Sequence, residues 1–222
     1  MPDCAANPSS VFVVDDDKQF LDSLVVLLQA LEFHVRGFSS PSSFLKYYRA
    51  EMPGCLVLDI RMPRQSGLQM YEQLIRDGKR LPVIFITAHA DVSTAIAAMK
   101  SGAIEFLEKP FDRETLLKRV RKALELDAES RQQNAHYAAI SHRIELLSAR
   151  ERETLALIQA GESNKSMAAR LFLTERAVEM RRSTIMRKLQ VRSVAELLEL
   201  ATTHRILTEQ GHSMDECRTD QA

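Results

Sequence analysis

Short apolar runs alternate with amphipathic stretches from Ser10 to about Leu126. The runs are VFVV (11–14), FHVRGF (33–38), CLVLDI (55–60), VIFIT (83–87) and AIEFL (103–107). Helix-like segments begin near Lys18, Pro41, Gly67, Asp91 and Asp112. Strict alternation of five strands and five helices predicts a doubly wound α/β fold, with a five-stranded parallel sheet covered on both faces. The central runs are apolar at consecutive positions, as buried parallel strands require.

After Leu126 the pattern is helical only. Residues 127–147 are polar, lack glycine and proline, and are predicted to form a helical linker. A first helix should run from about Ala149 to Gly161, a short second one from a cap at Ser163 or Asn164 to Leu171, and a third from a cap at Thr174 to about Leu189. This succession of helices and tight turns is the helix-turn-helix pattern.

These patterns divide the chain. We predict an N-terminal extension over residues 1–9, an α/β domain over 10–126, the linker over 127–147, a second and smaller all-α domain over 148–205, and a disordered tail over 206–222. The length of 222 residues allows each of the two domains to bury a core of its own.

The third predicted helix has two different faces. Projection at about 100° per residue places Val178, Ile185 and Leu189 together as its core face. Arg182 projects near that side, and we expect it to form a salt bridge with Glu151 or Glu153; Arg181 is intermediate and its role stays open. The opposite face, which we predict to read DNA, holds Arg176, Glu179, Met180, Ser183 and Arg187.

Charge supports this assignment of a nucleic-acid face. The whole chain carries 30 basic and 30 acidic residues, but residues 165–192 hold eight basic residues against two acidic ones. A locally basic helical segment in a neutral chain indicates a partner with negative charge.

Composition excludes several other classes of function. The three cysteines, Cys4, Cys55 and Cys217, form no CxxC pair, so neither a disulfide framework nor a zinc site is expected. The seven glycines are not spaced as a phosphate-binding loop requires, and we expect no kinase or ATPase and no enzyme. No apolar run reaches membrane-spanning length and no export signal is present, so we expect a cytoplasmic protein without a membrane partner.

The first apolar run ends in three adjacent carboxylates, VFVVDDD. Asp17 is expected to cap the helix that begins at Lys18. Asp15 and Asp16 end the first strand, Asp59 the third and Thr87 the fourth, while Lys109 follows the fifth. The carboxyl ends of parallel strands share one edge, where open α/β sheets bind ligands. Carboxylates with access to water suit magnesium, and a nearby lysine adds a second positive charge for an oxyanion.

The acid pair after VFVV, the Asp in CLVLDIRMP, the hydroxyl in VIFITAH and the Lys in FLEKPF resemble the receiver domains of bacterial two-component response regulators, which have a flavodoxin-like fold. The resemblance covers residues 10–126 and implies that Asp59 accepts a phosphoryl group from a sensor histidine kinase. It also implies that Asp15, Asp16, Asp59 and the carbonyl of Arg61 bind Mg²⁺, that Thr87 and Lys109 bind phosphate oxygens, and that Phe106 is the switch aromatic. The peptide bond from Lys109 to Pro110 would be cis.

The second domain resembles the LuxR-type output domain, most closely in LSARERETL, GESNK and IMRKLQVRS. With the receiver domain this gives the FixJ and NarL class, and it adds Asn164, Lys165 and Thr174 to the predicted DNA contacts. The family's usual TVKxH is AVEMR here, with Glu179 in place of Lys. Because glutamate can accept a hydrogen bond from cytosine N4, this departure predicts altered sequence preference rather than loss of DNA binding.

Two alternatives stay open. Asp15 and Asp17 also spell the DxD that haloacid-dehalogenase-like phosphatases resemble, although that reading leaves Asp59 unexplained. The other alternative is a regulator that a ligand or partner switches without phosphorylation. The preferred reading is a phosphorylation-dependent transcriptional regulator that binds double-stranded promoter DNA, dimerises on phosphorylation and has RNA polymerase as an expected partner.

Overall fold

A computed structural model of the chain describes residues 8–88, 96 and 98–205. Its internal contacts divide the chain into two compact units, residues 1–131 and 132–222. Within the described ranges, no helix combines the length and the apolar character needed to cross a membrane. The first seven residues, residues 89–95 and 97 in the helix expected from Asp91, and the C-terminal tail from residue 206 lie outside the described residues, whereas residues 96 and 98–100 are helical.

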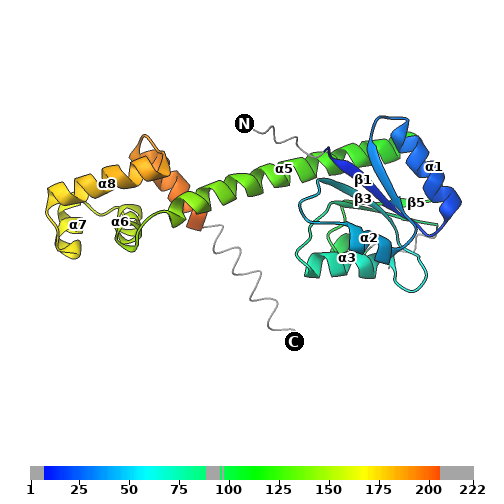
Figure 1. Ribbon diagram of the computed structural model, residues 1–222, viewed down its shortest axis with the longest axis horizontal. Helices are drawn as coiled ribbons and strands as arrows, with labels where there is room; N and C mark the ends of the chain where they lie inside the picture. Colours follow the sequence, from blue (N-terminus) through cyan, green and yellow to red (C-terminus); the bar gives the residue numbers. More distant parts are fainter. Residues whose placement is uncertain (1–7, 89–95, 97, 206–222) are drawn as a thin grey trace. The chain divides into compact units, whose positions relative to one another are not determined.

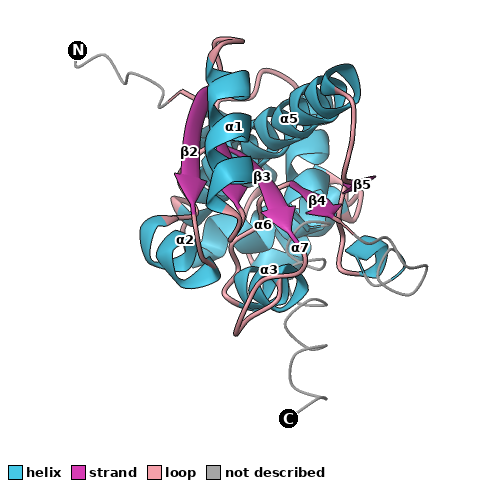
Figure 2. Ribbon diagram, turned by 90° about the vertical axis from the view of Figure 1, so that its right-hand side faces the viewer, coloured by secondary structure: helices cyan, strands magenta, loops and turns pink. Residues whose placement is uncertain are grey.

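The first unit is built on a five-stranded parallel sheet with the strand order β2-β1-β3-β4-β5, which confirms the predicted doubly wound fold (Figure 2). Its strands match the five apolar runs to within two residues at each end. They are β1 (Ser10–Val14), β2 (His34–Phe38), β3 (Gly54–Asp59), β4 (Val83–Thr87) and β5 (Glu105–Glu108).

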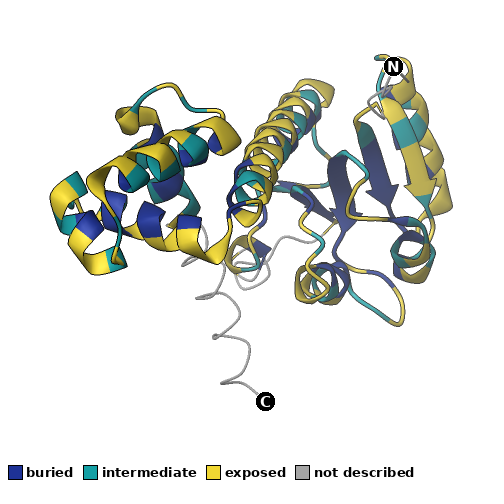
Figure 3. Cartoon of the chain, turned by 60° about the vertical axis from the view of Figure 1, so that its left-hand side comes forward, coloured by how far each residue is buried: buried dark blue, intermediate teal, exposed yellow. Residues whose placement is uncertain are grey.

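Helices cover both faces of this sheet, as Figure 1 shows. The helices of this unit are α1 (Lys18–Gln29), α2 (Pro41–Tyr47), α3 (Gly67–Arg76) and the first part of α5 (Arg113–Glu145). One apolar cluster joins α2 and α3 to one face, and a second joins α1 and α5 to the other. β3 and β4 are buried at every position, whereas the edge strand β2 is partly exposed throughout (Figure 3). The central strands therefore hold their carboxyl ends on a rigid support.

Local side-chain caps fix where the helices begin. Asp17 caps α1 as expected, because its carboxylate accepts from the backbone N–H groups of Gln19 and Phe20 at 3.0 and 3.2 Å. Ser66 and Gln69 form a capping box at the start of α3. At Gly67 an added Cβ would lie 2.1 Å from the carbonyl oxygen of Asp59, so only glycine allows α3 to begin this close to the end of β3.

A polar clamp ties α5 to the loop before β3. The buried carboxylate of Asp127 accepts from the N–H of Gly54 at 2.8 Å and from Arg131 Nε at 2.7 Å. Arg131 also donates to the carbonyl oxygens of Ala50 and Met52, at 3.1 and 2.6 Å. The first residues of the predicted linker thus belong structurally to the sheet-containing unit.

The second unit consists of helices packed around one apolar cluster. They are the end of α5, then α6 (Ala149–Gln159), α7 (Asn164–Leu171), α8 (Glu175–Leu189) and a helical stretch over residues 194–205. Ile140, Ile144 and Leu147 are buried in this cluster. The last part of the predicted linker is therefore helical as expected, but it also supplies core residues to the second unit.

Both α7 and α8 begin at the residues that were predicted to cap them. Ser163 caps α7 and Thr174 caps α8, with side-chain oxygens that accept from backbone N–H groups three residues later. Between the two helices Phe172 adopts a left-handed conformation, with φ of 54°, and the residue is 95% exposed. A left-handed residue with a Cβ is strained, and an exposed ring gains nothing from packing.

We therefore expect Phe172→Gly to stabilise the second unit by about 0.5–1 kcal/mol. Relief of the left-handed strain, worth about 1–2 kcal/mol, exceeds the extra chain entropy that glycine gives the unfolded state. Phe172→Ala is the matched control, because it removes the same ring but keeps the Cβ and should give no gain. Denaturant unfolding of the full chain, followed by circular dichroism, measures both. Equal stability of the Gly and Ala variants would contradict this account.

Candidate functional site

The carboxyl ends of four strands lie in a row along one edge of the sheet. In the parallel register Val14 pairs with Leu58, Asp59 with Ile86, and Thr87 with Glu108. Asp15 therefore follows β1 next to the end of β3, where Asp59 lies. Lys109, the first residue after β5, is held to β4 by its N–H, which donates to the carbonyl oxygen of Thr87 at 2.7 Å. The strand order thus brings together the residues that the sequence pattern placed at this edge.

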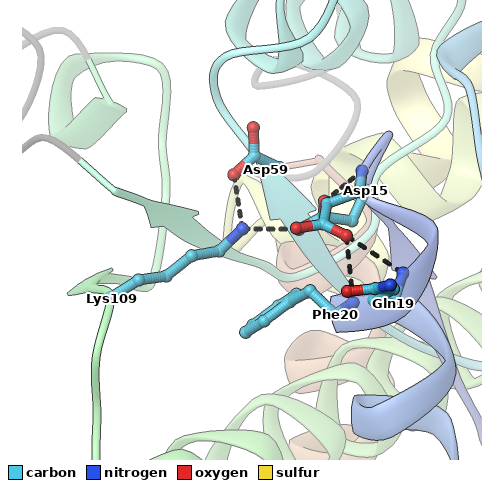
Figure 4. A network of polar contacts seen from close by, with 6 residues as sticks. Asp15, Gln19, Phe20, Asp59 and Lys109 are labelled. Carbon is cyan, nitrogen blue, oxygen red and sulfur yellow. Dashed lines mark hydrogen bonds and ion pairs between the residues drawn. The ribbon is translucent and has the colours of Figure 1, made fainter.

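Lys109 joins the two buried acids of this row (Figure 4). Its Nζ lies 2.6 Å from Asp15 Oδ2 and 2.9 Å from Asp59 Oδ1. Asp15 is 1% exposed and Asp59 5% exposed, so both charges are largely removed from water. A buried carboxylate is stable only when it is paired and hydrogen-bonded, and Lys109 supplies both interactions to each acid. The peptide bond from Lys109 to Pro110 is cis, as the resemblance to receiver domains implied.

The electrostatic balance around Asp59 favours a reactive carboxyl group. Burial raises its pKa above the ordinary value, the hydrogen bond and positive charge of Lys109 act against this rise, and the charge of Asp15 adds to it. The two carboxylates in turn raise the pKa of Lys109 against the opposing effect of burial. The lysine therefore stays cationic while Asp59 is a destabilised anion, which has more to gain from a further positive charge.

The three adjacent acids divide into three environments. Asp15 points inward to Lys109, and its Oδ1 also accepts from the N–H of Asp17 at 2.9 Å. Asp16 is exposed at the rim of the site, and Asp17 is used by the helix cap. Repulsion among them, about 4 kcal/mol for a pair at 4 Å and an effective dielectric near 20, is thereby reduced.

The remaining receiver residues lie at the same edge or just below it. Thr87 is fully buried at the end of β4, and a backbone hydrogen bond from Arg61 lowers the pKa of Asp59. Phe106 pairs with Phe85 in the sheet and packs, partly buried, against the α2 and α3 side. The Phe106 side chain is therefore partly accessible to solvent.

The oxygen atoms of the acid cluster are ligands of the kind that a hard cation such as Mg²⁺ prefers. Among the described residues, no three His, Cys, Asp or Glu side chains are grouped as a metal site, so Asp15 and Asp59 come together without Asp16. Lys109 takes one oxygen of each acid. Two carboxylates against one lysine leave one negative charge in excess, and the exposed Asp16 beside them gives access to water, which is what Mg²⁺ requires.

Phe20 is a neighbour of this site that the sequence pattern did not reveal. Its ring centroid lies 4.0 Å from Lys109 Nζ, and Figure 4 shows the ring beside the ammonium group and Asp15. The ring also meets Phe111 edge to face, with centroids 6.1 Å apart. The sequence feature that could have indicated this contact is the distance of Phe20 from the acid cluster. Phe20 lies one helical turn after the acids, on the helix that Asp17 caps.

The candidate DNA interface is the exposed face of α8. Val178, Ile185 and Leu189 are fully buried, which confirms the predicted core face. The opposite side is exposed at every predicted reading position, namely Arg176, Glu179, Met180, Ser183 and Arg187. Met180 is 67% exposed, which is unusual for a large apolar side chain and leaves it free for apolar contact with a base.

The other predicted DNA contacts lie at the helix starts. Lys165 is exposed near the start of α7, and Thr174 is exposed while its Oγ1 accepts from the N–H of Ala177 at 3.2 Å. Asn164 is partly buried and accepts at Oδ1 from Arg182 Nη1 at 2.5 Å. Asn164 therefore connects α7 to α8 in this structure.

The predicted salt bridge from Arg182 to Glu151 or Glu153 is wrong. Glu151 instead pairs with Lys188 at 2.7 Å and completes the capping box of α6 with Ser148, and the hydrogen bond from Lys188 is the main cause of its lowered pKa. Arg182 faces Asn164 because both lie where α7 crosses α8. Arg181, whose role was open, donates to Thr154 Oγ1 at 3.2 Å and links α8 to α6.

Two family descriptions match this chain. "Response regulator receiver domain" matches residues 11–121, and "Bacterial regulatory proteins, luxR family" matches residues 145–201. The first range contains the whole acid site, and the second contains the helix-turn-helix.

Several response regulators are similar to this chain along most of its length. The response regulator protein TodT of Pseudomonas putida is 38% identical over 192 residues, covering 86% of this chain and 85% of its own. The transcriptional regulatory protein FixJ of Azorhizobium caulinodans is 38% identical over 191 residues, covering 86% and 90%. The solved structure of the response regulator StyR is 42% identical, with a TM-score of 0.82 over 88% of this chain and 99% of its own. Full-length FixJ from B. japonicum is 33% identical, with a TM-score of 0.54 over 89% and 98%. The chain therefore belongs to the two-component response regulators that join a receiver domain to a LuxR-type DNA-binding domain.

Proposed function

We propose that Asp59 is the phosphoacceptor of this transcriptional regulator and that its phosphorylation controls DNA binding by the face of α8. The observation that carries the proposal is the Lys109 ammonium between the buried carboxylates of Asp15 and Asp59. We assign the receiver function to residues 10–126 and DNA binding to residues 148–205. The chain acts in the cytoplasm.

The proposed transfer starts from a phosphohistidine of a sensor kinase. A carboxylate oxygen of Asp59 attacks the phosphorus, the bond from phosphorus to the histidine nitrogen breaks, and the imidazole leaves with the bonding electron pair. The product is an acyl phosphate on Asp59. Lys109 then faces a phosphoryl oxygen in place of the carboxylate oxygen of Asp59, and Thr87 supplies a hydroxyl at the end of β4. Burial assists the attack because it makes the ionised Asp59 less stable.

Magnesium is the proposed cofactor. Asp15, Asp16, Asp59 and the carbonyl oxygen of Arg61 would hold it, and the ion would neutralise charge on the transferring phosphoryl group. Support comes from the excess negative charge that Asp15 and Asp59 leave against one lysine and from the oxygen-only donors of the cluster. Asp16, exposed at the rim, would complete the set together with water.

The proposed switch connects the acyl phosphate to the surface near Phe106. Thr87 moves toward the phosphoryl group, Phe106 follows it inward, and the surface of β5 repacks so that two receivers pair. A dimer places two output domains on half-sites of double-stranded promoter DNA about one helical turn apart. Bound in this way, the protein acts on transcription by RNA polymerase.

Incubation of the full chain with Mg²⁺ and a small phosphodonor should label Asp59 alone. The expected label is an acyl phosphate that alkali and hydroxylamine remove, located by mass spectrometry of peptides. Asp59→Asn should take none, because its amide is not a nucleophile. An Asp59→Asn chain that still carries such a label would refute the assignment.

The metal-free cluster should be more stable without the charge of Asp59. Because burial raises the pKa of Asp59 in the folded chain, its ionised form costs stability at neutral pH, and this cost disappears as the pH falls through the raised pKa toward 3.8. Asp59→Asn should thus raise the melting temperature at pH 7 in a chelator, and lose this advantage in acid. Asp16→Asn, at an exposed position, is the control with a smaller gain.

Magnesium should reverse the order of stability of the wild-type chain and Asp59→Asn. The wild-type chain gains about 1.4 kcal/mol at ten times Kd, whereas Asp59→Asn gains less. Calorimetry with and without Mg²⁺ measures both effects. A wild-type melting temperature indifferent to Mg²⁺ would count against the metal site.

DNA binding should respond differently to two substitutions on α8. Arg187→Ala should weaken binding to all sequences and reduce the slope of log K against log salt by about one unit, because a phosphate contact carries no sequence information. Glu179→Lys should change which sequences are selected from a random pool, because its charge faces base edges. Selection followed by salt titration measures both. Identical selected sequences for Glu179→Lys and the wild type would remove Glu179 from base recognition.

A further inference from the structure

The contact between Phe20 and Lys109 lies outside the roles assigned so far. Phe20 is the third residue of α1, and its N–H donates to Asp17 Oδ1, so the helix cap fixes its backbone. Phe111 supports the ring from the side by an edge-to-face contact at 87°. The ring is only partly buried. Its backbone and its side chain are therefore both held where the ring faces the lysine.

The ring meets the side of the ammonium group that the acids leave open. A lysine Nζ has three N–H donors, and two of them are used by Asp15 Oδ2 and Asp59 Oδ1. The ring centroid of Phe20 lies 4.0 Å from the same Nζ, within the range of a cation–π contact. Lys109 is thus held by two carboxylates and one aromatic face.

We propose that Phe20 is a positioning residue for phosphoryl transfer, which holds the Lys109 ammonium in place by a cation–π contact. This inference rests on the proposed phosphorylation of Asp59. When Asp59 becomes an acyl phosphate, one of the two carboxylate contacts of Lys109 changes its chemistry. The ring is uncharged and does not react, so it keeps its contact before and after the transfer. A long, flexible side chain restrained in this way loses less entropy on reaching the transition state.

A ring in this place could also serve packing alone, since Phe20 borders the apolar cluster under α1 and α5. The two roles differ in what they change. A packing defect lowers the fraction of chains that are folded and accept a phosphoryl group. Loss of positioning lowers the rate constants of both the transfer to Asp59 and the hydrolysis of the acyl phosphate, because one ammonium stabilises similar charge in both reactions.

The experiment uses the full chain, saturating Mg²⁺ and acetyl phosphate as phosphodonor. Phe20→Leu should slow phosphorylation and acyl-phosphate hydrolysis by about three- to tenfold each, the range that a partly buried cation–π contact implies. Phe20→Tyr keeps the aromatic face and should restore both rates. Phe33→Leu is the matched control, because Phe33 packs on the same apolar cluster. It should leave the hydrolysis rate of the labelled chains unchanged.

An NMR measurement tests the contact without any reaction. In the metal-free, unphosphorylated wild type, the ε-methylene protons of Lys109 should resonate upfield of those of other lysines because of the ring current. Lys109→Met assigns the signal, and Phe20→Leu should remove the shift. An unshifted signal in the wild type, or Phe20→Leu rates equal to the wild type, would overturn the proposal. A wild type that takes no label while the shifted signal is present would instead refute the phosphorylation of Asp59.

Discussion

The ammonium group of Lys109 bonds two buried carboxylates, and the rest of the receiver structure is arranged so that this can happen. Without it Asp15 and Asp59 would be two unpaired charges in the interior, a state that costs several kcal/mol. The pairing requires three strand ends to meet within hydrogen-bond distance. A parallel sheet in the order β1, β3, β4, β5 meets this requirement, because every strand points its carboxyl end to the same edge.

The same constraint explains the residues around the pair. Gly67 lets α3 start against the carbonyl of Asp59, and Asp17 turns the chain into α1 immediately after the acid pair. In both cases a helix begins close to the end of a strand, so that loops and side chains surround the strand ends. One ammonium group serves both buried acids, so the cluster has more negative than positive charge. Lys109 therefore compensates the two buried acids only in part, and burial keeps the pKa of Asp59 above its ordinary value.

Most of this arrangement could be predicted because it follows from periodicity and from the geometry of parallel strands. Apolar runs predicted the strands, and their carboxyl ends placed Asp15, Asp59, Thr87 and Lys109 at one edge. The partners of long side chains could not be predicted in this way. Arg182 meets Asn164 because of the angle at which α7 crosses α8, and Lys188 meets Glu151 because of the angle at which α6 crosses α8. Helical projection carries no information on crossing angles. Phe20 likewise looked like an ordinary apolar residue of α1, because periodicity does not show that its ring contacts Lys109.

Side-chain partners also explain why α5 belongs partly to the first unit and partly to the second. Polar composition over residues 127–147 predicted a linker, because a linker helix has no core to face. Asp127 and Arg131 are instead polar because they bind backbone groups of the loop before β3, and Ile140 and Ile144 are apolar because they enter the second core. Polarity alone does not separate a free helix from one that is clamped by hydrogen bonds. In this chain the helix is thus a structural part of each unit, because hydrogen bonds of Asp127 and Arg131 hold its first part to the loop before β3 and Ile140 and Ile144 bury its last part in the second core.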